Sequence, residues 1–129
     1  MKQRQLQLSF LKDKYGICTL PNTATIPDWA LTQSLASITR TDKELTIVCR
    51  QDIIPSELQS DINWRCFRID GSFDLDQIGV ISSISSPLAD AGISIYVIST
   101  YDTDYFLVKE EKLNQALSVL SNSNHSITK

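Results

Sequence analysis

"ISIYVISTYDTDYFLV", residues 93–108, consists of two apolar runs separated by a polar turn, and this pattern decides the fold. The runs Ile93 to Ile98 and Tyr105 to Val108 are rich in β-branched and aromatic residues, which favour β-strands. The intervening STYDTD supplies hydroxyl and carboxylate side chains, which are typical of turns because they bond to their own backbone. The stretch therefore predicts a β-hairpin with a polar turn.

The segments before and after this hairpin both have apolar residues at helical spacing. Before it, a capping-box-like Asp74–Gln77 precedes apolar residues at helical spacing, and Gly92 supplies a left-handed stop. Pro87 lies inside this helix, and we expect a bend or an irregular last turn there. After the hairpin, residues 110–120 predict a second amphipathic helix, followed by a polar tail in which His125 is expected to be solvated.

A strand at residues 64–69 completes a strand, helix, strand, strand, helix order, which is a ferredoxin-like unit short of its last strand. The first half predicts the same order: a strand at 15–20, a short helix at 26–30, a hairpin over 34–50 and a weak helix at 53–58. The fold class is therefore α+β. We expect two ferredoxin-like βαββα units, residues 1–62 and 63–129, with antiparallel sheets and helices on one face. An extra N-terminal strand, Leu6 to Leu11, should complete a sheet.

Composition excludes several classes of function. The chain has 129 residues, 12 basic against 15 acidic, and a pI near 5.0, so we expect neither nucleic acid nor membrane as a partner. The N-terminus lacks the apolar core of a signal peptide, which predicts a cytoplasmic protein. Cys18, Cys49 and Cys66 show no C-x-x-C spacing and are expected to be buried apolar residues rather than metal ligands or disulfides.

Several segments together resemble the ACT domain, a small-molecule-sensing regulatory module. They are FDLDQIGV at 73–80, SPLADAGI at 86–93 and STYDTDYFLV at 99–108. More closely, the chain resembles the tandem ACT proteins of bacteria, most of which are uncharacterised, and the related cytosolic arginine sensors of animals. TRTDKELTIVC at 39–49, followed by Pro55, resembles the degenerate first repeat of the bacterial proteins.

The resemblance implies a ligand site where the loop before the first helix meets a neighbouring ACT unit. By position, it implies ligand-binding residues at the helix start (Asp76, Ile78 and Gly79) and in the turn (Thr100, Tyr101 and Asp104). The chemistry fits an amino acid. Helix N–H groups attract a carboxylate, Gly79 allows close approach, and Asp104 can pair with an ammonium or guanidinium group.

Each of these features also has a purely structural interpretation, and both interpretations stay open at this point. The STYDTD side chains can simply stabilise their own turn, and Gly79 can serve close packing of a helix on a strand. The four carboxylates Asp74, Asp76, Asp102 and Asp104 lack the remaining ligands of a calcium loop, which favours capping and turn roles over a metal site.

Catalysis has no coherent set of residues in this sequence, because the single histidine, His125, lies in the polar tail. We therefore expect a non-catalytic regulatory module, without cofactor or metal, that binds a small ligand, an amino acid, at an ACT–ACT interface. A protein effector of unknown identity would read the bound state, and a homodimer is compatible with the resemblance. The alternative is a ligand-free domain for oligomerisation or protein interaction.

Overall fold

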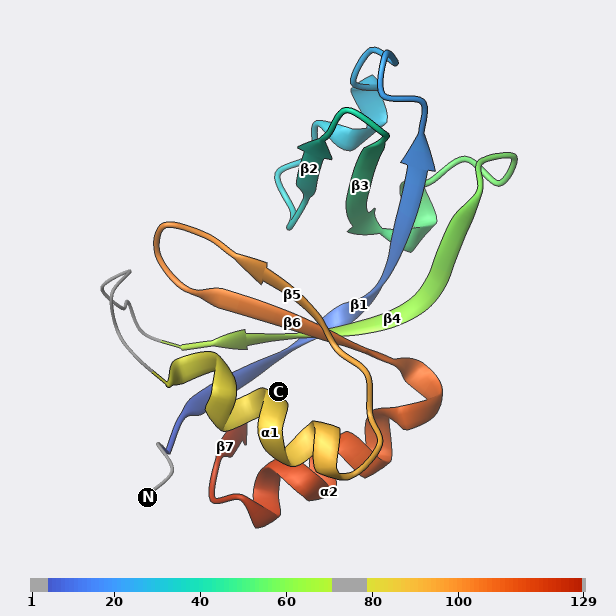
Figure 1. The fold of residues 1–129 in the computed structure, drawn as a ribbon. Helices are drawn as coiled ribbons and strands as arrows, with labels where there is room; N and C mark the ends of the chain where they lie inside the picture. Colours follow the sequence, from blue (N-terminus) through green and yellow to red (C-terminus); the bar gives the residue numbers. More distant parts are fainter. Residues whose placement is uncertain (1–4, 71–78, 129) are drawn as a thin grey trace. The chain divides into compact units, whose positions relative to one another are not determined.

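The computed structural model describes residues 5–70 and 79–128, which form two compact units (Figure 1). Unit 1 contains Met1–Lys12 and Arg65–Lys129, and unit 2 contains Asp13–Trp64. Strands β1 (Gln7–Leu20) and β4 (Ser60–Ile69) each contribute to both units. The two strands predicted at residues 6–11 and 15–20 are thus one continuous strand, because the polar residues between them carry no Gly or Pro to break the extended backbone.

The described strands form a seven-stranded sheet in the order β2-β3-β1-β4-β6-β5, with β7 beside β1. Unit 1 contains β5 (Tyr96–Ser99), β6 (Asp104–Lys109), β7 (Ser126–Thr128), α1 (Val80–Asp90) and α2 (Leu113–Asn122), the last preceded by a 3-10 turn at Glu110–Lys112. The antiparallel pairing of Tyr96 with Leu107 and of Ser99 with Asp104 confirms the predicted hairpin. The strand, helix, strand, strand, helix order of this half is also confirmed, while β7 in the tail was not predicted.

The N-terminal half of β1 belongs to unit 1, where the sequence placed an additional strand. Its residues Gln7 to Ser9 pair in parallel with Ser126 to Thr128 of β7, and the N–H of Asp70 donates to the carbonyl of Gln7 at 2.8 Å. Strand β1 therefore lies between β4 and β7 and is not at the edge of the sheet.

The core of unit 1 lies between the sheet and the two helices. Its buried members come from β1, β4, β6, α1 and α2, and include Leu8, Phe67, Ile69, Ile84, Leu88, Phe106, Val108 and Leu120. The rings of Phe67 and Phe106 stack with centroids 4.9 Å apart, and Phe10 packs against Phe67 at 5.2 Å. The apolar periodicity of both helices thus serves this core.

Helix α1 runs through Pro87, and a histidine from the tail compensates for the missing hydrogen bond. Proline has no N–H, so it cannot donate to the carbonyl of Ser83 four residues earlier. The Nε2 atom of His125 lies 2.9 Å from that carbonyl oxygen, and Nδ1 of His125 accepts the N–H of Leu6 at 3.1 Å. This pairing fixes the neutral tautomer with the proton on Nε2. The expectation of a solvated His125 is wrong: the side chain is 4% exposed.

Unit 2 contains β2 (Ser37–Arg40), β3 (Leu45–Arg50) and two 3-10 turns, η1 (Asp28–Ala30) and η2 (Gln51–Ile53). The short helix predicted at 26–30 is only a 3-10 turn at Asp28–Ala30, and the helix predicted at 53–58 does not form. Both α-helices of the described residues lie in unit 1. The expectation of a second βαββα unit is therefore wrong for this half. After η1 the backbone leaves the helical region at Leu31, with ψ 72°, and after η2 it is extended at Ile54, which precedes Pro55, with ψ 124°, so neither turn continues into a longer helix.

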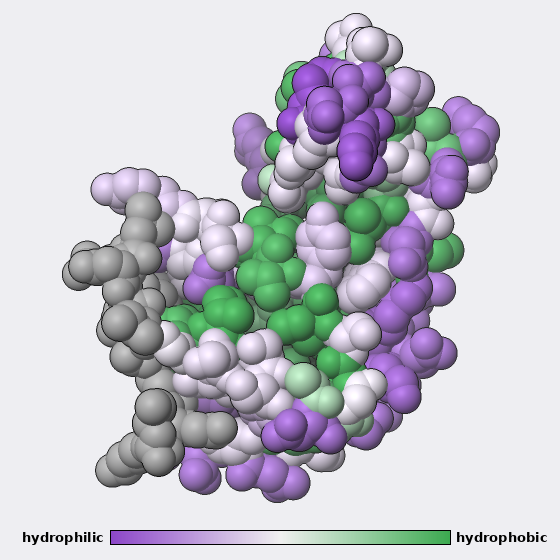
Figure 2. Space-filling model, viewed as in Figure 1, coloured by the Kyte–Doolittle hydropathy of each residue, from purple (hydrophilic) through white to green (hydrophobic). Residues whose placement is uncertain are grey.

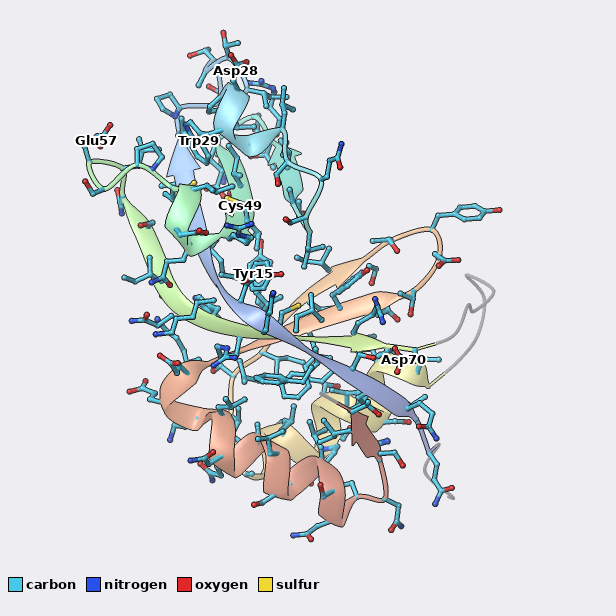
Figure 3. The ribbon with its side chains drawn as sticks, turned by 180° about the vertical axis from the view of Figure 1, so that it is seen from behind. Tyr15, Asp28, Trp29, Cys49, Glu57 and Asp70 are labelled. Atoms are coloured by element: carbon cyan, nitrogen blue, oxygen red, sulfur yellow. The ribbon has the colours of Figure 1, made fainter. Side chains whose placement is uncertain are left out.

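The core of unit 2 is small and contains two of the three cysteines. Cys18, Ala30, Leu45, Ile47 and Cys49 are buried, and Trp29 packs against them (Figure 3). Around the β2–β3 turn the surface of this unit is strongly hydrophilic (Figure 2). Cys66 is buried in β4, so all three cysteines are free and buried, as expected. No helix in the described ranges combines the length and apolarity needed to span a membrane.

Candidate functional site

The turn between β5 and β6 is held by its own hydroxyl groups. The Thr100 Oγ1 atom accepts the N–H of Thr103 at 3.1 Å and that of Asp102 at 3.3 Å, and donates to the Thr103 carbonyl at 3.0 Å. The Thr100 N–H donates to the same carbonyl at 2.8 Å. This is a side-chain-stabilised turn, so the local interpretation accounts for Thr100.

Thr103 joins the turn to the end of β4. Its hydroxyl donates to the carbonyl of Ile69 at 2.6 Å, and the residue is 8% exposed. A buried hydroxyl must be hydrogen-bonded, and here the acceptor belongs to the neighbouring strand. Thr103 therefore fixes the turn beside the C-terminal end of β4.

The other turn residues of the predicted site have different surroundings. Tyr101 is 88% exposed at the tip of the turn. Asp104 is the first residue of β6, lies opposite Ser99 and is partly buried. Because side chains alternate along a strand, Asp104 shares the face of Phe106, whose ring lies in the core beneath the helices.

Gly79 is the residue immediately before α1 and has a left-handed backbone with φ 86°. Among the described residues, an added Cβ would meet only the Ser82 Oγ atom, at 3.8 Å, and the left-handed backbone angle by itself favours glycine. The Gly79 carbonyl accepts the N–H of Ser83 at 3.1 Å and the Ser83 hydroxyl at 2.7 Å. Asp76, Ile78 and the predicted capping box lie outside the described residues.

A hollow of about 310 Å³ lies where β4 and the β5–β6 turn meet. It is lined by Arg68, Ile69, Asp70, Thr100, Asp102, Thr103 and Tyr105. Of the described residues predicted for the site, Thr100 lines this hollow, whereas Gly79, Tyr101 and Asp104 do not. Sequence reasoning missed Arg68 and Asp70, although their spacing of two residues on a strand indicates that they share one face.

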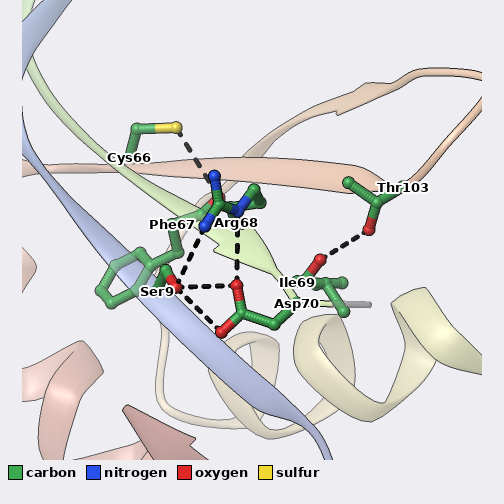
Figure 4. Close-up of polar contacts among 7 residues, drawn as sticks. All are labelled: Ser9, Cys66, Phe67, Arg68, Ile69, Asp70 and Thr103. Carbon is green, nitrogen blue, oxygen red and sulfur yellow. Dashed lines mark hydrogen bonds and ion pairs between the residues drawn. The ribbon is translucent and has the colours of Figure 1, made fainter. Parts of the chain in front are cut away.

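Arg68 and Asp70 belong to a polar cluster with Ser9 of β1 (Figure 4). The Ser9 hydroxyl lies 2.7 Å and 2.8 Å from the two carboxylate oxygens of Asp70. The Arg68 guanidinium contacts this pair more loosely: Nε lies 3.3 Å from Asp70 Oδ1 and Nη2 lies 3.4 Å from Ser9 Oγ. The partly exposed Arg68 thus borders the hollow, while Ser9 binds the carboxylate of Asp70.

The thiols of this protein are poorly suited to nucleophilic chemistry. Burial raises the pKa of Cys66 to about 12, and burial, with smaller contributions from Cys18 and Asp52, raises that of Cys49 to about 11. Burial also raises the pKa of Cys18. Since the thiolate is the reactive form, these cysteines are packing residues. Among the residues described, no group of three or more His, Cys, Asp or Glu side chains could hold a metal ion.

Comparison with known proteins assigns the family. The model of the ACT domain matches residues 59–122, and a model of a separate N-terminal domain matches residues 13–57. A crystal structure of protein Atu0741 from Agobacterium tumefaciens is 41% identical, with a TM-score of 0.92 over 97% of this chain and 93% of that one. The chain belongs to the ACT-domain family. The resemblance found in the sequence is therefore confirmed.

Other ACT-domain relatives extend the comparison. The human cytosolic arginine sensor for mTORC1 subunit 1 is 32% identical over 101 residues, which cover 78% of this chain and 30% of the sensor. The chain thus spans about a third of the length of the curated relatives that it matches. The regulatory subunit of aspartate kinase from Thermus thermophilus has a TM-score of 0.60 at 12% identity, over 90% of this chain and 96% of that one, and shares the fold.

Proposed function

We propose that this protein is a non-catalytic regulatory module that binds an amino acid at the end of unit 1 where α1 begins. The observation that carries the proposal is the position of the turn: the Thr103 hydroxyl bond anchors it to the end of β4, and α1 begins at that same end of the sheet (Figure 1). The relationship to the cytosolic arginine sensors supports an amino acid as the ligand.

The proposed site combines the start of α1 with the hairpin turn. The first N–H groups of a helix attract an anion, and the left-handed Gly79 has no side chain that would stand between a ligand and its own backbone. Asp104 would pair with an ammonium or guanidinium group, and the exposed ring of Tyr101 would cover the ligand. The other proposed ligand-binding residues are Asp76, Ile78 and Thr100.

The resemblance to ACT-domain proteins implies a site that lies against a neighbouring unit, so a homodimer or a partner protein would complete it. Binding would act by shifting an existing equilibrium, because a ligand favours whichever packing it contacts better. A downstream protein effector would then respond to that packing. The effector would therefore respond to the binding of the ligand, and not to the product of a reaction.

The test is thermal unfolding of the protein against a panel of amino acids. A ligand at one hundred times its dissociation constant should stabilise the fold by about 2.7 kcal/mol, which raises the midpoint by several degrees for a chain of this size. Asp104→Asn keeps the size of the side chain and removes its charge, so it should abolish the shift for a basic ligand. An unchanged shift in this variant would remove Asp104 from the site.

Two glycines provide a matched pair of variants. Gly79 and Gly92 both have left-handed backbones, at φ 86° and 75°, and no atom of the residues that the structure describes would clash with an added Cβ at either position. Alanine at either position should cost about 1–2 kcal/mol of stability. Only Gly79→Ala should also weaken amino-acid binding, and equal binding by both variants would contradict a role for the start of α1.

A ligand-free interaction domain is the alternative function, and one surface favours it. Among the described strands, β5 is at the edge of the sheet, where Val97 is 37% exposed, and Tyr101 of the following turn is 88% exposed. An edge strand offers unpaired backbone groups to another chain. If the midpoint rises with protein concentration and no amino acid changes it, this second function replaces the first.

A further inference from the structure

We infer that the hollow beside Arg68 is a second binding site, for a small carboxylate that carries a hydrogen-bond donor on its α-carbon. This site differs from the one proposed above, because Gly79, Tyr101 and Asp104 do not line the hollow, and Thr100 is the one described residue that belongs to both. Alternation along the strands supports the separation. Tyr105 lines the hollow, whereas its neighbour Asp104 shares the opposite, helix-covered face with Phe106.

Arg68 is free to change its partner. Both contacts of its guanidinium, at 3.3 Å and 3.4 Å, lie beyond the usual range for a charge-assisted hydrogen bond, and its side chain is 46% exposed. Within the described ranges, Nη1 of Arg68 forms no hydrogen bond. A planar guanidinium binds a carboxylate through two parallel N–H groups, so a ligand carboxylate can offer a better geometry than Asp70 does.

Asp70 would remain satisfied when Arg68 moves. The Ser9 hydroxyl contacts both oxygens of Asp70 at 2.7 Å and 2.8 Å, so the carboxylate keeps its closest partner. An ionised carboxylate has about four acceptor positions, and Oδ2 is engaged by Ser9 alone among the described residues. Asp70 can therefore accept a donor from the α-substituent of the same ligand that binds Arg68.

Charge and size narrow the class of ligand. Among the described residues that line the hollow, Arg68, Asp70 and Asp102 are charged, so two negative charges accompany one positive charge there. This balance favours an α-ammonium over an α-hydroxyl group and disfavours a second carboxylate. A volume of about 310 Å³ lies at the small end of ligand sites, which suits a metabolite of amino-acid size and excludes a dinucleotide.

The experiment is a titration of the ¹⁵N-labelled protein followed by NMR. The probes are the standard L-amino acids, the C-terminal amide of each amino acid that binds, and the corresponding 2-hydroxy acid. The Arg68 Nε–H signal, assigned by its disappearance in Arg68→Lys, reports on the hollow together with the backbone N–H of Thr103 and Tyr105. The N–H signals of Val80 and Asp104 report on the site at α1.

We expect an amino acid to move the Arg68 and Thr103 signals, and its amide, which lacks the carboxylate, to leave them unmoved. Arg68→Gln should weaken this binding by about tenfold or more. The matched control is Arg50→Gln, because Arg50 also pairs with the aspartate two residues later, Asp52 at 2.6 Å, but lies in unit 2. Arg50→Gln should bind as the wild type does.

Four results would overturn the inference, and they separate it from the proposed function. Shifts confined to Val80 and Asp104 would leave the first site standing and exclude the hollow. Equal binding of an amino acid and its amide, or unchanged binding by Arg68→Gln, would exclude the carboxylate contact. If no probe moves any signal, both sites are wrong. Binding of the hydroxy acid as tightly as the amino acid would assign a hydroxyl, and not an ammonium, as the donor.

Discussion

Replacing His125 tests how the tail stabilises unit 1. The ring accepts the N–H of Leu6 at 3.1 Å and donates to the carbonyl of Ser83 at 2.9 Å, and all three residues are buried. His125→Ala leaves one donor and one acceptor buried without a partner. Each such group costs about 1–3 kcal/mol, so the two together should lower the free energy of unfolding by about 3 kcal/mol.

A double-mutant cycle with Pro87 isolates one of the two hydrogen bonds. In Pro87→Ala the new N–H at position 87 can donate to the Ser83 carbonyl, as in any uninterrupted helix. His125→Ala should then cost about 1–1.5 kcal/mol less in the Pro87→Ala background than in the wild type. His125→Asn serves as a further control, since its amide oxygen can accept the Leu6 N–H and should recover about half of the loss.

Urea unfolding measures these differences, and two probes follow the two units separately. Circular dichroism reports mainly on unit 1, because both α-helices of the described chain lie there. Fluorescence reports on unit 2, because Trp29 and Trp64 both belong to it. A cost below about 1 kcal/mol for His125→Ala, or an equal cost in both backgrounds, would refute the assigned contacts.

Two further predictions concern buried polar groups. Thr103→Val keeps the shape of the side chain but removes the 2.6 Å bond to the Ile69 carbonyl, so it should cost about 1–3 kcal/mol in urea unfolding, while Thr103→Ser should recover most of it. Burial raises the folded-state pKa of Cys49 to about 11 and that of Cys66 to about 12, above the usual value of 9.0. Because the folded protein favours the protonated thiols, their burial contributes stability that is complete below pH 9. This stability is lost as pH rises through 11–12. A midpoint of unfolding that stays constant from pH 8 to 11 would contradict this burial, as would rapid labelling of the native thiols at pH 8.

Local sequence signals determined most of unit 1. The β5–β6 hairpin follows from residues 93–108 alone, because β-branched runs and a turn of hydroxyl side chains act over neighbouring residues. The amphipathic helix ending at Gly92 and the helix at residues 110–122 were equally readable from their periodicity. In unit 2, by contrast, the helices predicted at 26–30 and 53–58 did not form, and only short 3-10 turns lie at Asp28–Ala30 and Gln51–Ile53, since five or six residues are too few to sustain a helix without packing.

Only the tertiary structure decided which residues distant in sequence contact one another. The separations are 119 residues for Leu6 and His125, and 61 for Ser9 and Asp70, so no local pattern reveals either pair. The turn and Gly79 of the candidate site could be predicted from the sequence, because both depend on local backbone preference. It could not supply the hollow beside Arg68, because that arrangement exists only once β1, β4 and the turn lie together in the folded sheet.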